Sequence, residues 1–207
     1  MVRKAGTGDR RHDNAAATRD ALLAAGRRQF GAVGFEAASV AELCAEAAVT
    51  TGALYYHFGD KKGLFAGVAE DLDRAMVALT GRAAQTATAA GAGPWDAFLA
   101  ACDAFVAAGL DPGGRRIGLV EAPAVLGHDW TAIRERHGLG AIQTHVIRLQ
   151  GAGVLLSADP ARLARMILGL LYAAVEATTD RAGLAQTLDV LHAMLAALKA
   201  QPGDRSA

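Results

Sequence analysis

Residues 51–57, TGALYYH, carry the most distinctive combination of side chains in the sequence. The threonine and tyrosine hydroxyls can bond phosphate oxygens, and the glycine and alanine leave room for a backbone to approach the edges of DNA bases. The stretch contains no carboxylate, which a polyanion would repel. This combination favours a helix that lies against DNA.

A short helix should precede this stretch and position it. Ser39 and Glu42 have the spacing of a capping box, so the helix is expected to begin at Val40. Leu43 and Cys44 continue its apolar face at helical spacing. A helix of about two turns cannot hold itself together in water, so it needs packing partners.

A second short helix is expected over residues 50–58. Leu54 and Phe58 fall one turn apart on its inner face, and Gly59 can end it with a positive φ angle. The two helices and their turn form a helix-turn-helix pattern, whose second helix enters the major groove. The alternative is a helical hairpin that only packs on the rest of the chain, and the two outward-facing tyrosines argue against it.

Residues 22–65 resemble the DNA-binding domain of the tetracycline-repressor (TetR) family of bacterial transcription regulators. The resemblance rests on Gly34 and Phe35, on VTTGALYYHF at residues 49–58 and on GDKKGLF at residues 59–65. It implies an all-α fold in which an N-terminal helix-turn-helix domain is joined through a long helix to a larger helical domain that binds a ligand and dimerises. It also implies a repressor that leaves a roughly palindromic DNA operator when a small-molecule effector binds.

The expected DNA contacts fall into two groups. Base edges should be read by Thr51, Gly52, Ala53 and Tyr56. The helix should be held on the phosphates by Ser39, Thr50, Tyr55, His57 and Lys61. The lysine lies in the first turn of the next helix, where a cation opposes the helix dipole and a nearby phosphate would relieve that conflict.

Three parts of the chain are expected: a flexible basic arm (residues 1–17), the helix-turn-helix domain (residues 18–65) and a helical effector-binding and dimerisation domain (residues 66–207). The net charge is zero overall, but residues 1–65 carry nine Lys and Arg against seven Asp and Glu. Most of this excess precedes Thr18, the expected N-cap of the first helix. A basic arm can reach into a minor groove, and a solvated tail is the alternative.

Turn residues divide the rest of the chain into helices. Expected helices begin after Asp60, at Pro94, near residue 115, after Asp129 and at Pro160. The fourth of these should run from Trp130 to about Gln150. No part of the chain has the alternating pattern of a β-strand.

The last two helices are expected to pair with those of a second copy in a homodimer. Both carry leucine-rich seams with spacings of three and four, which are typical of helices in bundles. Their apolar surface extends beyond one stripe, which indicates a second packing partner. The expected interface residues are Met166, Gly169, Leu170, Ala173, Leu188, Leu191 and Leu195.

Aromatic and apolar residues of the larger domain, with a few polar groups among them, would suit a mostly hydrophobic small molecule. The candidate effector-binding residues are Phe98, Cys102, Phe105, Glu121, Trp130, His145, Tyr172 and Glu176. For each of them, ordinary core packing is the alternative.

Enzymatic function is not expected. The sequence has no glycine-rich phosphate loop, no nucleophile elbow and no histidine or cysteine cluster with metal-ligand spacing, so neither a cofactor nor a metal is expected. The longest apolar run, residues 166–175, is too short to span a bilayer, and no signal peptide is recognisable, so a cytoplasmic protein without membrane contact is expected. The remaining alternative to a regulator is a helical protein-interaction module without specific DNA binding.

Overall fold

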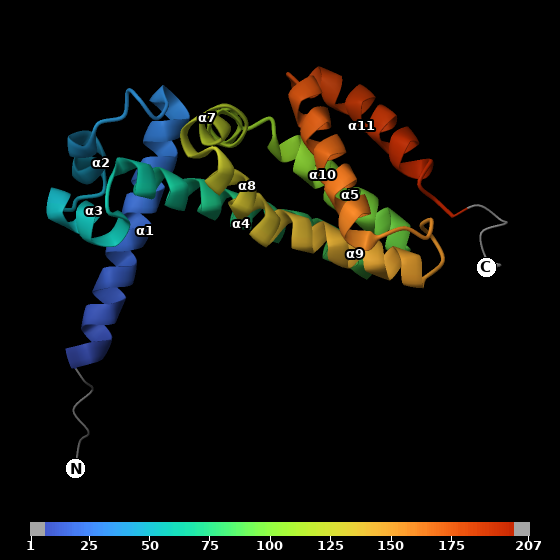
Figure 1. Cartoon of the computed structure of the whole chain (residues 1–207), viewed down its shortest axis with the longest axis horizontal. Coiled ribbons are helices and arrows are strands. Elements are labelled where there is room, and N and C mark those ends of the chain that lie inside the picture. The colour runs from blue at the N-terminus through green and yellow to red at the C-terminus, as the bar shows by residue number, and fades with distance from the viewer. Residues whose placement is uncertain (1–6, 201–207) are drawn as a thin grey trace, which may run out of the picture. The chain divides into compact units, whose positions relative to one another are not determined.

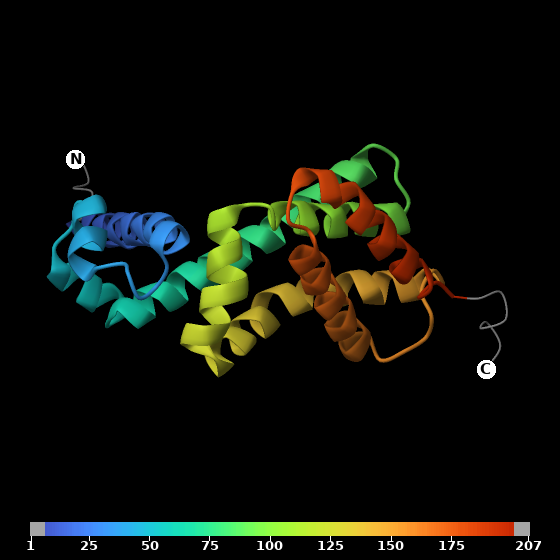
Figure 2. The ribbon, with the colours of Figure 1, turned by 90° about the horizontal axis from the view of Figure 1, so that it is seen from above.

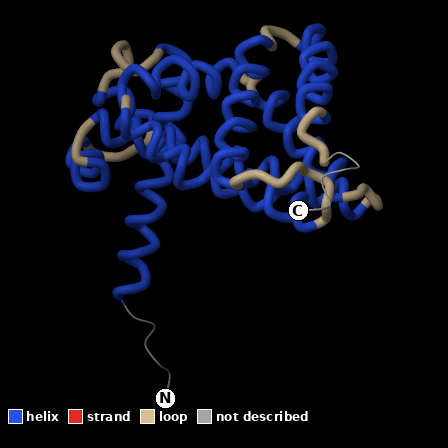
Figure 3. Tube along the Cα trace, turned by 45° about the vertical axis from the view of Figure 1, so that its right-hand side comes forward, coloured by secondary structure: helices blue, strands red, loops and turns tan. Residues whose placement is uncertain are grey.

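The computed structural model describes residues 7–200, with side chains from residue 14 onward. All regular elements in that range are helices (Figure 3), as the sequence predicts, and an isolated bridge joins Leu155 to Lys199. The elements, most of which are labelled in Figure 1 and two of which are π-helical segments written η, are α1 (Thr7–Val33), α2 (Val40–Glu46), α3 (Thr51–Phe58), α4 (Lys61–Ala89), α5 (Pro94–Ala108), α6 (Pro112–Arg115), η1 (Arg116–Glu121), α7 (Ala122–Leu126), α8 (His128–Arg134), η2 (Glu135–Leu139), α9 (Gly140–Gly151), α10 (Pro160–Ala177) and α11 (Arg181–Ala196).

The chain divides into two compact units. The first unit holds the chain up to Leu72 together with Pro112–Trp130, and the second holds Asp73–Asp111 together with the chain from Thr131 onward. These units differ from the domains expected from the sequence, because α4 belongs to both of them and because α6, η1 and α7 join the N-terminal unit. The functional boundary between residues 65 and 66 stays a prediction.

Aromatic rings hold the first unit together at the C-terminal half of α1. Phe30 meets Phe65 of α4 edge-on with 5.1 Å between ring centroids, and Phe35 lies 5.2 Å from Phe65. The fully buried leucines of α1, α2 and α3 include Leu22, Leu43 and Leu54. The apolar faces predicted for the helix-turn-helix therefore form its core.

Helix α1 begins earlier than the sequence suggests. It starts at Thr7, so Thr18 lies inside the helix and is not its N-cap. The Thr18 hydroxyl donates to the carbonyl oxygen of Asn14 at 2.8 Å, one turn back along the same helix. Residues 7–17, expected as part of a flexible arm, are helical here, and residues 1–6 lie outside the described range.

Helix α10 is the central element of the second unit. It packs against α5, α9 and α11, and Figure 2 shows it crossing α9. Its start confirms the predicted cap, because Asp159 accepts from the backbone N–H of Arg162 at 3.1 Å and Pro160 is the first helical residue. Its buried face includes Leu163, Ile167, Leu168, Leu171 and Val175.

The middle of the chain differs in detail from the expected helices. The helix expected from Trp130 to Gln150 instead begins at His128, so Asp129 lies in its first turn, and the π-helical segment η2 interrupts it. The stretch expected near residues 115–125 is divided among α6, η1 and α7. None of the helices in the described range is both long enough and apolar enough to cross a membrane.

Candidate nucleic-acid interface and ligand cavity

A side-chain hydroxyl caps the N-terminus of each helix of the helix-turn-helix. Ser39 Oγ accepts from the backbone N–H of Glu42 at 3.1 Å, and Thr50 Oγ1 accepts from the N–H of Ala53 at 3.3 Å. Gly59 ends α3 with φ of 80°, as predicted. Each capping hydroxyl still carries an O–H donor, so capping leaves it able to bond a phosphate oxygen.

The outward face of α3 exposes most of the residues predicted to contact DNA, and Ala53 on this helix is half-buried. Tyr56 is 83% exposed and Tyr55 is 52% exposed. Leu54, on the opposite face of α3, is fully buried in the core. His57 is half-buried and meets the Tyr56 ring edge-on at 5.1 Å. Gly52 is also exposed, and a Cβ there would meet only Thr50 Oγ1, at 3.8 Å. Packing within the described chain therefore does not explain the small residue at this position.

Lys61 bonds to the chain itself. Its ammonium donates to the carbonyl oxygens of Phe35 at 2.9 Å, Ala38 at 3.2 Å and Glu36 at 3.4 Å. The same nitrogen lies 4.4 Å from the centroid of the Phe35 ring. These contacts use all three donors of the ammonium to hold residues 35–38, the segment that leads into α2. This role was not predictable, because the partners are 23–26 residues away along the chain.

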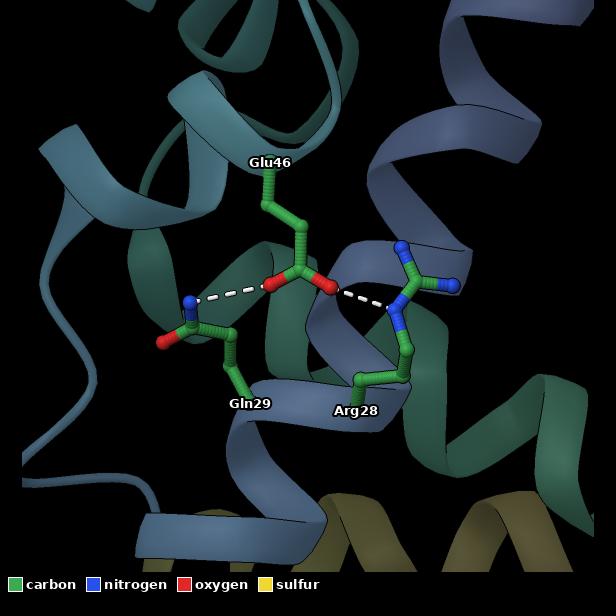
Figure 4. A network of polar contacts seen from close by, with 3 residues as sticks. All are labelled: Arg28, Gln29 and Glu46. Atoms are coloured by element: carbon green, nitrogen blue, oxygen red, sulfur yellow. Dashed lines mark hydrogen bonds and ion pairs between the residues drawn. The ribbon is translucent and has the colours of Figure 1, made fainter.

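A polar network ties α2 to α1 (Figure 4). The two oxygens of the Glu46 carboxylate accept from Arg28 Nε and from Gln29 Nε2, the latter at 2.9 Å. Hydrogen bonds from Arg28 and then from Gln29 lower the pKa of Glu46 below its ordinary value. A carboxyl whose pKa falls on folding stabilises the fold above its unfolded pKa, and this contribution is lost as the pH drops through the folded value. The network thus helps to orient α2, and with it the turn before α3, at neutral pH.

The segment at residues 112–121 packs on the C-terminal end of α1 within the first unit. The backbones of Gly31 and Gly113 approach so closely that a Cβ on Gly31 would lie 3.0 Å from the Cα of Gly113. Arg116 donates to the carbonyl oxygen of Ala32, and the Glu121 carboxylate lies against Gly34. Glu121 was predicted to bind the effector, and the structure places it at the end of α1.

The second unit contains a cavity of about 220 Å³. Five of the eight predicted effector-binding residues line it, namely Phe98, Cys102, Phe105, His145 and Tyr172. Trp130 is a buried residue of the first unit, and Glu176 is exposed and does not line this cavity. Two charged residues of the lining, Asp73 and Arg134, were not among the predicted residues.

Burial sets the protonation of the cavity wall. It raises the pKa of the Cys102 thiol to about 12 and the pKa of the Tyr172 hydroxyl to about 12. Burial, followed by the nearby Arg148, lowers the pKa of His145. All three groups are therefore uncharged near pH 7.

The outer face of α10 and α11 carries exposed apolar residues. Met166 is 66% exposed, Val190 57% and Met194 51%, and Gly169 and Ala173 are also exposed. Leu191 and Leu195 were expected at a subunit interface, but they are 2% and 0% exposed and belong to the core of the unit. Their leucine seam serves packing within one chain, and the neighbouring positions form the outer face. Leu170 and Leu188 are half-buried.

Two family models match the sequence. A model described as the tetR family of bacterial regulatory proteins covers residues 22–68, and one described as a tetracyclin repressor-like C-terminal domain covers residues 95–198. A search of curated proteins finds no match. The first matched range contains the capped helix-turn-helix, and the second contains most of the cavity lining.

Solved structures resemble the whole chain. A TetR-family transcriptional regulator from Pectobacterium atrosepticum is 36% identical, with 92% of this chain and 98% of that chain covered and a TM-score of 0.75. RolR in complex with resorcinol is 18% identical, with 92% and 91% covered and a TM-score of 0.69. The fatty acid degradation regulator FadR from Bacillus halodurans is 15% identical, with 99% and 100% covered and a TM-score of 0.68. The last two likenesses concern the fold alone.

Proposed function

The chain belongs to the TetR family of bacterial transcriptional regulators, and we propose that it is a sequence-specific DNA-binding repressor released from its operator by a small, mostly hydrophobic ligand. The outward face of α3 carries this proposal. It exposes two tyrosines, a threonine and a glycine without any carboxylate, on a helix fixed at both ends. A helix that only packed within the protein would need no such surface.

In this proposal Thr51, Gly52, Ala53 and Tyr56 read base edges, while Ser39, Thr50, Tyr55 and His57 hold α3 on the phosphates. Selection of duplexes from a random DNA library with the purified full chain tests it. We expect enrichment of a roughly palindromic sequence whose half-sites lie about one DNA turn (34–36 Å), or a multiple of it, apart. A failure to enrich any sequence at low salt would leave a helical interaction module as the better description.

The ligand part of the proposal is supported by the cavity in the second unit. Its lining is mostly apolar, with a few polar groups, which is the usual composition of small-molecule sites. RolR, which shares the fold, was solved in complex with resorcinol. Cytoplasmic localisation follows from the proposed role, because the operator is in the cytoplasm.

Lys61→Met tests both roles of this lysine. We propose that its charge also lies near a phosphate, so the slope of log K against log salt should fall by about one unit. Loss of three charge-assisted hydrogen bonds should also destabilise the first unit, by about 2 kcal/mol. Lys62→Met, at an exposed neighbouring position, is the control for stability. Lower stability with an unchanged salt slope would restrict Lys61 to holding residues 35–38.

We further propose that the outer face of α10 and α11 forms a homodimer. Gly169→Glu should produce monomers in sedimentation velocity at micromolar concentration, because an isologous interface would bring two copies of the new carboxylate into an apolar contact. Gly151→Glu is the matched control, since a Cβ at either glycine meets nothing within 4 Å. A wild-type protein that sediments as a monomer at this concentration would contradict the proposal.

A further inference from the structure

We propose that the cavity of the second unit binds a neutral aromatic molecule of one or two fused rings, anchored by a hydroxyl group that accepts a hydrogen bond from Arg134. This inference rests on the proposed ligand-binding function and names the chemical class of the ligand. The cavity's size, the rings in its wall and its charges support it separately.

The size of the cavity limits the ligand. An engineered apolar cavity of about 150 Å³ holds benzene. The cavity here has about 220 Å³, so it has room for a substituted benzene or a small bicyclic molecule. Typical sites for drug-sized ligands begin at about 300 Å³, so a larger molecule would either extend out of the open side of the cavity or require the walls to move.

The wall of the cavity favours a ring. The rings of Phe105 and Tyr172 meet edge-on with 5.4 Å between their centroids. The ring centroids of Phe98 and His145 lie 5.9 Å apart. Small residues such as Ala141 and Gly138 also line the cavity. Aromatic rings prefer offset and edge-to-face neighbours, and a ligand ring placed here would extend both pairs.

Arg134 supplies the polar anchor. Its guanidinium lies over the Tyr172 ring, 3.7 Å from the ring centroid, which fixes its position in the wall. Its Nε is buried and makes no hydrogen bond within the described structure. A buried donor without an acceptor is unfavourable, and a ligand oxygen that reached Nε after a small shift of the arginine side chain would remove this penalty.

The charges of the lining favour a neutral ligand. Arg134 and Asp73 carry opposite charges and both line the cavity. A carboxylate ligand would be attracted by Arg134 but repelled by Asp73, and an ammonium ligand the reverse, so the lining as a whole favours neither ion. His145, Cys102 and Tyr172 are uncharged near pH 7 and do not alter this balance. A ligand hydroxyl group can both donate and accept a hydrogen bond, so it suits a wall that contains a positively charged arginine and a negatively charged aspartate.

Calorimetric titration of the full chain at pH 7.5 tests the inference, with phenol, 2-naphthol, toluene, benzoate and benzylamine as probes. We expect phenol and 2-naphthol to bind at least tenfold more tightly than the other three. Arg134→Met should remove this advantage, so that phenol and toluene bind with similar affinity. Arg165→Met is the control. It removes an exposed arginine of the same unit that pairs with Glu135, and it should leave the affinities for phenol and for toluene unchanged. A crystal structure with 2-naphthol should place the naphthol oxygen next to Arg134 Nε.

Each contrary result overturns a defined part of the inference. Equal affinities for phenol and toluene, or an Arg134→Met protein that binds phenol as the wild type does, would exclude the hydroxyl anchor. Tighter binding of benzoate or benzylamine would exclude a neutral ligand. No binding of any probe would exclude the ligand class, even for a protein that selects an operator. A protein that binds phenol but selects no DNA sequence would instead contradict the proposed function.

Discussion

Ala53→Glu is expected to abolish specific operator binding. Ala53 lies in the first turn of α3, on the helix whose outward face we propose to read the major groove. A glutamate there would bring a carboxylate and its hydration shell against the acceptor atoms and phosphates of DNA. Specific binding by such proteins typically exceeds non-specific binding by a factor of at least about 1,000. The affinity for the selected operator should therefore fall by about that factor, to the level of a random duplex.

Two variants separate charge from size and position. Ala53→Gln keeps the size of the new side chain without its charge, so it should also lose the preference for the operator but bind both duplexes more tightly than Ala53→Glu does, because it adds no repulsion of the phosphates. Ala24→Glu places the same charge at an exposed position of α1 in the same unit and should change operator affinity by less than about threefold, because screening weakens distant charges. Fluorescence anisotropy with operator and scrambled duplexes measures all three proteins. If the Ala53→Glu protein bound its operator nearly as well as the wild type, the proposal that α3 lies in the major groove would be wrong.

Features set by short-range rules were predictable from the sequence. The caps predicted at Ser39 and Asp159 follow from hydroxyl or carboxyl side chains placed before the first helical turn, and the structure shows both, whereas Thr18 lies inside α1 and Thr50, expected as the first residue of its helix, is the cap of α3. Gly34 and Gly59 end their helices with positive φ angles. These interactions span only a few residues, so the order of residues alone determines them.

Features that join distant parts of the chain were not predictable. The contacts of Lys61 with residues 35–38 and the bonds of Glu46 with Arg28 and Gln29 span 17–26 residues, and no periodicity marks them. The assignment of Leu191 and Leu195 to a subunit interface failed for a related reason. A leucine seam shows that a helix face is buried, but it does not show whether the partner is in the same chain.

The residues of the cavity were only partly predictable from the sequence. Its aromatic residues stand out in the sequence, and five of the predicted candidates do line it. Asp73 and Arg134 resembled ordinary surface charges, because their neighbours in the sequence are also charged. Glu121 and Trp130 were assigned to the wrong unit, because residues 112–130 pack with the N-terminal helices. That packing depends on the close approach of Gly31 and Gly113, and single glycines in a glycine-rich sequence carry no such signal.

Gly63→Val is expected to unfold the helix-turn-helix at a temperature where the wild type is folded. Gly63 lies in the first turn of α4, where its N–H donates to Asp60 Oδ1 at 2.6 Å. A Cβ at this position would overlap the carbonyl oxygen of Phe58, the last residue of α3. A backbone oxygen cannot move aside as a flexible side chain can. We therefore expect a cost near the upper end of the range for overpacking, about 3 kcal/mol.

Hydrogen exchange at the amides of α2 and α3 measures this cost in the affected unit. A loss of about 3 kcal/mol corresponds to roughly a hundredfold faster exchange through opening of the unit, since about 1.4 kcal/mol is a factor of ten. Gly81→Ala in the same helix is the control, because a Cβ there meets nothing within 4 Å. Alanine favours a helix interior over glycine by about 1 kcal/mol, but Gly81 belongs to the second unit, so this variant should leave exchange at the amides of α2 and α3 unchanged. Equal exchange rates in Gly63→Val and the wild type would show that the turn between α3 and α4 can relax, and that the position of α3 does not depend on this glycine.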